Sequence, residues 1–129
     1  MQQYYLASHF DKIFMQPSGM IGLLGVHLPT FFYKKLLAKV GIQPEFFKFF
    51  EYKNAPNAFT EDHFTEAHRH QTQSLADSLF HQIVSTIARE RGMSQDAVRQ
   101  CIDSAPLLAS EGLKVCNISR VQYSSCTFV

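Results

Sequence analysis

The sequence predicts an incomplete domain of the α/β class, in which short strands alternate with helices. Apolar runs over residues 12–15, 20–26 and 42–50 have the length of buried strands, and a helical pattern separates the last two. Strand, helix and strand in succession are typical of a sheet with crossover helices. At 129 residues the chain holds one domain at most, which is small for a complete α/β enzyme, so we expect a piece of a longer protein.

The first 26 residues predict the end of a helix and two strands. Tyr4-Tyr5-Leu6-Ala7-Ser8 is typical of a helix end, and residues 12–15 read as a short buried strand. The run 20–26 contains Gly22 and Gly25, and glycines inside a strand mark a bend or a close approach of another backbone. This run is therefore either a tightly packed bend or a strand edge where a peptide substrate docks.

A short amphipathic helix is predicted next. Thr30 is a candidate N-cap and Gly41 supplies a stop. Four apolar side chains between them recur at helical spacing: Phe32, Leu36, Leu37 and Val40. Residues 42–50 then predict the returning strand.

Lys53 is the residue that we single out as a candidate catalytic group. It ends the aromatic stretch of residues 46–52, which is too short to span a membrane and predicts a strand buried on at least one face. A lysine at a strand end usually points into water. Beside a wall of phenylalanines, however, the ammonium form would lose hydration, and the neutral amine that this favours is a general base. The pattern alone leaves both interpretations open.

The second half predicts helices. Thr65 is a good N-cap, and one apolar face then continues until Gly92 through Leu75, Leu79, Ile83 and Ile87. Ser94 opens a shorter helix whose inner side carries Ala97, Val98, Cys101 and Ile102. Residues 107–113 predict a last short helix after Pro106.

Composition excludes several classes of function. Net charge is +1 and Lys and Arg are spread along the chain, so we expect no nucleic-acid partner. The three cysteines, Cys101, Cys116 and Cys126, contain no C-x-x-C pair and favour core or free thiols. We expect no metal or cofactor, because His68 and His70 point to different helix faces and His63 and His81 complete no set of three ligands.

An ordered series of short motifs resembles the signal peptide peptidases of the protease IV type over residues 3–115. It runs through Tyr4-Tyr5-Leu6-Ala7-Ser8, Lys12-Ile13, Gly22, Gly25-Val26, Tyr33-Lys34, Leu36-Leu37, Gly41-Ile42, Glu51-Tyr52-Lys53, Ala55, Phe59, Thr60, Asp62, Arg91-Gly92-Met93-Ser94 and Ile102-Asp103. Each piece is weak, and the order carries the resemblance. It implies a ClpP/crotonase-like α/β fold and a serine endopeptidase that uses a Ser-Lys dyad on cleaved signal peptides and other peptides.

When the family's functional residues are carried over by position, the resemblance implies that Lys53 is the general base. It also implies that Gly22, Gly25 and Val26 line the substrate cleft. In single-repeat relatives the serine lies three residues before the tyrosine pair, where this chain has Met1. In duplicated relatives the lysine comes from the N-terminal repeat and the serine from the C-terminal one. Gln3-Tyr4-Tyr5 resembles that N-terminal repeat, so we expect the lysine-bearing half, with the serine on another segment or subunit of a homo-oligomer.

Two departures accompany the resemblance. Asn54 follows the lysine where the family commonly has Ser, and residues 116–129 form a divergent tail. The resemblance also implies membrane association, with the catalytic domain on the non-cytoplasmic side. The alternatives are a non-catalytic fragment or paralogue that acts in assembly and, more weakly, acyl-CoA handling of the crotonase kind.

Overall fold

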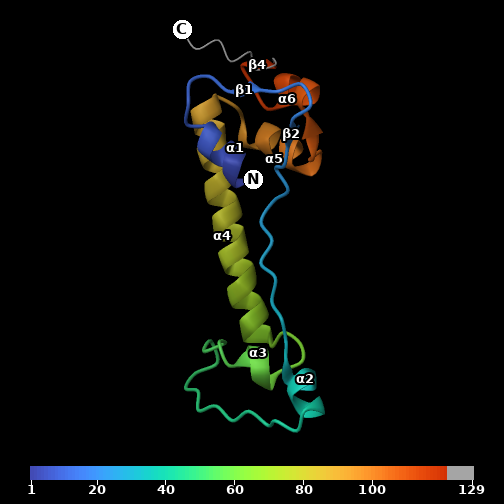
Figure 1. Cartoon of the computed structure of the whole chain (residues 1–129). Helices are drawn as coiled ribbons and strands as arrows, with labels where there is room; N and C mark the ends of the chain where they lie inside the picture. The colour runs from blue at the N-terminus through green and yellow to red at the C-terminus, as the bar shows by residue number, and fades with distance from the viewer. Residues whose placement is uncertain (122–129) are drawn as a thin grey trace. The chain divides into compact units, whose positions relative to one another are not determined.

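The chain forms two compact units in the computed structural model, which describes residues 1–121. Unit 1 contains residues 1–26 and the described residues from 80 onward, and unit 2 contains residues 27–79. The long helix α4 (Glu66–Arg91) supplies its first part to unit 2 and its last part to unit 1 (Figure 1).

Unit 1 is built of short helices and two-residue strands around the end of α4. Its other elements are α1 (Gln2–Ala7), β1 (Phe14–Met15), β2 (Met20–Ile21), α5 (Gln95–Asp103), β3 (Leu107–Leu108), α6 (Ala109–Val115) and β4 (Arg120–Val121). Strand β1 pairs with β4 in parallel, and β2 pairs with β3 in antiparallel orientation. The predicted strands over 12–15 and 20–26 are therefore present but much shorter, and the predicted helix over 107–113 begins two residues later, after β3.

The core of unit 1 collects buried side chains from all parts of its sequence. Its members are Tyr4, Ile13, Ile21, Leu23, Val84, Ile87, Ala88, Val98, Cys101, Leu107, Cys116 and Ile118. The predicted inner face of α5 is confirmed at Val98 and Cys101, and Cys101 and Cys116 are free, buried thiols. Cys126 lies outside the described residues.

The predicted N-caps of α4 and α5 and the predicted end of α4 are confirmed. The hydroxyl of Thr65 accepts a hydrogen bond from the backbone N–H of His68 at 3.3 Å, which caps α4, and Ser94 caps α5 through the N–H of Ala97 at 3.2 Å. Gly92 ends α4 with a φ of +60°, a conformation that favours glycine. The predicted apolar face of α4 is buried only toward its C-terminal end, because Leu75 is 54% exposed whereas Ile87 is 1% exposed.

Unit 2 contains α2 (Lys34–Lys39), α3 (Asn57–Thr60) and the first part of α4. Helix α2 ends before Gly41, as predicted, and Gly41 has a φ of +76°. Its N-cap is Tyr33, so the prediction of Thr30 as N-cap was wrong, and none of its residues is buried.

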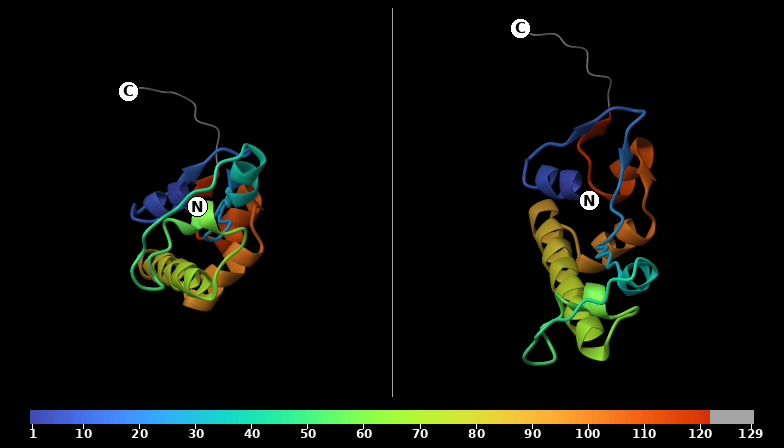
Figure 2. Two further views of the ribbon diagram at one scale, coloured as in Figure 1. Left: turned by 90° about the horizontal axis from the view of Figure 1, so that it is seen from below. Right: turned by 60° about the horizontal axis from the view of Figure 1, so that its bottom comes forward.

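The predicted strand over residues 42–50 is absent, and this is the main correction to the sequence-based fold. Residues 42–56 form an extended loop without helix or strand, which the further views in Figure 2 also show. Phe47 is 99% exposed and Phe50 is 88% exposed. A strand needs a neighbour to satisfy its backbone and cover its apolar face, and none of the described residues pairs with this segment.

The described part of the chain thus has mixed helix and small strand content, without the predicted strand-helix-strand crossover. None of the helices over residues 1–121 is long and apolar enough to cross a membrane.

Candidate active site

Lys53 lies exposed in the loop between α2 and α3, on the wall of a pocket of about 510 Å³ within unit 2. Three aromatic side chains share this wall: Phe47, Phe49 and Tyr52. The phenylalanine wall expected from the sequence is therefore beside the lysine. It does not exclude water, however, because Phe49 is 79% exposed and Phe47 almost completely so. The dehydration that would favour a neutral amine is absent from unit 2 as described.

The backbone of the lysine loop is held by short-range hydrogen bonds. The N–H of Lys53 donates to the carbonyl of Phe50 at 3.4 Å, and the N–H of Asn54 donates to the carbonyl of Tyr52 at 3.0 Å. Phe50 has a φ of +68°, which is uncommon for a bulky side chain. The chain thus turns sharply at the end of the aromatic stretch, and Lys53 follows that turn.

A buried amide network lies directly behind Lys53. Asn57 is completely buried, and its Nδ2 donates to Oδ1 of Asn54 at 3.1 Å and to Oγ1 of Thr65 at 3.3 Å. Nδ2 of Asn54 donates to Oε1 of Gln71 on α4, and Nζ of Lys48 donates to Oδ1 of Asn57 at 2.9 Å. This network was not predicted from the sequence. The signal available was two asparagines three residues apart, flanking Pro56, in a segment otherwise rich in aromatic residues.

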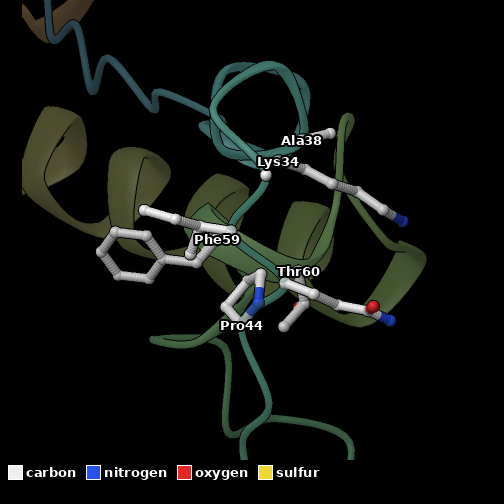
Figure 3. Close-up of a pocket in the computed structure, with 8 residues that line it drawn as sticks. Lys34, Ala38, Pro44, Phe59 and Thr60 are labelled. Carbon is white, nitrogen blue, oxygen red and sulfur yellow. The ribbon is translucent and has the colours of Figure 1, made fainter.

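A second pocket of unit 2, also about 510 Å³, lies between α2, α3 and residues 41–44 (Figure 3). Lys34 and Ala38 from α2 line it together with Pro44, Phe59 and Thr60. The ring of Phe59 stacks on Tyr33 and on Phe46, each with ring centroids 5.9 Å apart. This pocket offers a packing surface, and its lining contains no histidine or carboxylate that could act as a base.

The predicted substrate-binding residues Gly22, Gly25 and Val26 belong to unit 1 and follow strand β2. Gly22 lines a pocket of about 200 Å³ together with Met1, Tyr4 and Ile13, and its carbonyl accepts a hydrogen bond from the amino group of Met1. Gly25 has a φ of +78°. The glycine run is therefore a bend that directly follows the paired strand β2.

No serine is bonded to Lys53 within residues 1–121. The hydroxyl of Ser8 donates to the carbonyl of Tyr5 at 2.7 Å, and that of Ser119 accepts from the N–H of Ile13 at 3.1 Å. Burial raises the pKa of the Cys116 thiol to about 12, which leaves almost no thiolate at neutral pH. Unit 2 as described thus contains a candidate base without a serine hydrogen-bonded to it.

The acidic and histidine residues before α4 form ion pairs. Asp62 accepts from Nδ1 of His63 at 2.5 Å and lies 3.2 Å from Nζ of Lys35, and these contacts lower the pKa of its carboxyl group to about 2. Within residues 1–121, no group of three histidine, cysteine or acidic residues lies close enough to hold a metal ion.

Comparison with known proteins identifies the family to which the chain belongs. The model of peptidase family S49 matches residues 1–126, and the chain belongs to this family. The family is one of serine peptidases, and its members are hydrolases.

Two relatives are named Protease 4. The chain is 32% identical to the protein of Salmonella typhi over 92 residues, which are 71% of this chain and 15% of that protein. It is 24% identical to the protein of Haemophilus influenzae over 96 residues, 74% of this chain and 16% of that protein. The chain therefore spans about one-sixth of the length of these relatives.

Proposed function

We propose that this chain is the lysine-bearing part of a serine endopeptidase of the protease IV type, and that Lys53 is its general base. The observation that carries the proposal is the family match over residues 1–126, together with an exposed lysine on a pocket wall. The serine comes from another segment or subunit, and the completed domain has the ClpP/crotonase-like fold. The substrates are cleaved signal peptides and other peptides.

The proposed chemistry needs one proton to move twice. The neutral amine of Lys53 takes the proton of the serine hydroxyl while the serine oxygen attacks the carbonyl carbon of the peptide. The lysine then gives this proton to the amine of the peptide as the peptide bond breaks, and the acyl group remains bonded to the serine. Water hydrolyses this acyl-enzyme by the same steps, with the lysine again acting as general base. The exposed position of Lys53 suits this scheme only when a second segment covers the pocket, because contact with that segment would remove water from the amine.

Replacement of Lys53 by Ala in the intact gene product tests the proposal. General-base catalysis contributes about 10²- to 10⁴-fold, so we expect cleavage of casein or of a signal peptide to fall by that factor. Lys39→Ala is the matched control, because Lys39 is an exposed lysine of the same unit outside this pocket. Undiminished cleavage by the Lys53→Ala protein would refute the proposal.

A non-catalytic role in assembly is the second candidate, and the exposed aromatic segment favours it. Phe46, Phe47, Phe49 and Phe50 are between 49% and 99% exposed, and clustered apolar surface of this kind marks interaction sites. A fluorophosphonate probe tests this second candidate: specific labelling of one of the chain's serines would exclude the non-catalytic role.

A further inference from the structure

The buried amide network behind Lys53 connects three pieces of unit 2. Asn54 and Asn57 come from the lysine loop and from the start of α3, Gln71 comes from α4, and Thr65 is the N-cap of α4. The residue next to the candidate base is thus tied by side-chain hydrogen bonds to the most regular element of the unit.

Lys48 fixes which amide atoms of this network donate and which accept hydrogen bonds. A lysine ammonium has donors only, so the oxygen that Lys48 contacts is Oδ1 of Asn57. Nδ2 of Asn57 must then face Oδ1 of Asn54 and Oγ1 of Thr65, and Nδ2 of Asn54 faces Oε1 of Gln71. In each of these hydrogen bonds an N–H group thus faces an oxygen atom.

Burial makes this arrangement specific. Asn57 is 0% exposed and Asn54 is 9% exposed, and a buried amide without a partner is costly. A shift of the loop would leave the fully buried amide of Asn57 without its partners. The N–H of Asn57 also donates to the carbonyl of Asn54 at 3.0 Å, which closes the loop over the two residues between them.

We infer that Asn54, Asn57 and Gln71 are positioning residues, which hold the loop so that Lys53 lies on the wall of its pocket. This inference rests on the proposed role of Lys53 and adds to it the groups that fix its place. Lys53 makes no side-chain hydrogen bond or ion pair with the residues over 1–121, so the backbone beside it is what determines where its amine can reach. Gln71 lines the same pocket, and its acceptor anchors the loop to α4.

Gln71 provides the sharpest test because its side chain is at the surface, so its replacement does not create a cavity. Gln71→Ala removes the acceptor of the Asn54 amide. Gln73→Ala is the matched control: Gln73 is a glutamine of the same helix whose amide donates to Asp77 at 2.8 Å, away from the loop. Peptide cleavage is measured in the intact gene product together with the Lys53→Ala variant.

We expect Gln71→Ala to lower kcat about 10- to 100-fold with KM nearly unchanged, because a small misplacement of a catalytic group has effects of this size. Gln73→Ala leaves kcat unaltered. If Lys53→Ala abolishes cleavage while Gln71→Ala behaves like Gln73→Ala, the positioning inference is wrong and the proposed base stands. If Lys53→Ala cleaves normally, the proposed function itself fails. A fall in melting temperature with no change in kcat below the melt would assign the network to stability alone, which also contradicts the inference.

Discussion

Helix α4 allows one prediction that separates its two halves. Ile87 and Leu75 lie on the same predicted apolar face of this helix, yet Ile87 is 1% exposed and Leu75 is 54% exposed. Ile87 belongs to the core of unit 1, where it is grouped with Val84, Val98 and Cys101. Removing a buried isoleucine to Ala loses its transfer free energy and leaves a cavity, at a cost of about 2–5 kcal/mol.

The matched variant is Leu75→Ala. Surface substitutions usually change stability by less than about 0.5 kcal/mol, and Ala is also the better helix former. The entropy of unfolding is about 2.1 cal/mol/K per residue, so a loss of about 3 kcal/mol lowers the melting temperature of a chain of this length by about 10 °C. Leu75→Ala should lower it by about 2 °C or less.

Urea denaturation followed by circular dichroism measures both variants against the unaltered chain. The midpoint should fall strongly for Ile87→Ala and hardly at all for Leu75→Ala, with the slope unchanged. Equal losses for the two variants would refute the reasoning, because they would show that the first half of α4 is as buried as the second.

Two further predictions concern the glycine run and Asp62. Gly25→Ala should destabilise the chain by about 1–2 kcal/mol, because Gly25 has a positive φ of +78°. Gly22→Ala should not destabilise it, since a Cβ added at Gly22 meets nothing within 4 Å. Equal melting temperatures of the two variants would contradict this prediction. The Asp62 carboxyl group should titrate near pH 2 by NMR, and its pKa should rise toward 3.8 most in His63→Ala and also in Lys35→Ala, but not in Lys34→Ala. The pKa of the Asp62 carboxyl group is lower in the folded chain than in the unfolded one, so any stabilisation from its contacts is present above about pH 4 and is lost as the pH falls through about 2. A titration midpoint of Asp62 that stays near 3.8 in the unaltered chain would contradict its contacts with His63 and Lys35.

Local signals predicted the helices of the second half well. Thr65 and Ser94 are N-caps in the structure, and Gly92 ends α4, because capping depends on residues only a few positions apart. The resemblance to the protease IV type was likewise readable from residue order, and the match to peptidase family S49 confirms it.

Strands were predicted less well, because a strand exists only through its partner. Residues 42–50 have the composition of a buried strand, yet none of the described residues pairs with them and they form a loop. The same limit applies to the apolar face of α4, where periodicity identified the face and packing decided which half of it is buried.

By itself the sequence determined the family of this chain, its candidate base and the ends of its long helix, since these depend on residue identity at fixed spacing. Only the tertiary structure decided what surrounds Lys53. It placed the lysine on an exposed pocket wall, without a serine hydrogen-bonded to it within unit 2, and connected Asn54 to the buried Asn57 and to Gln71 at the surface of α4. A contact between a loop and a helix, such as that of Asn54 with Gln71 17 residues further on, leaves no periodic pattern, because it depends on how the chain turns in between.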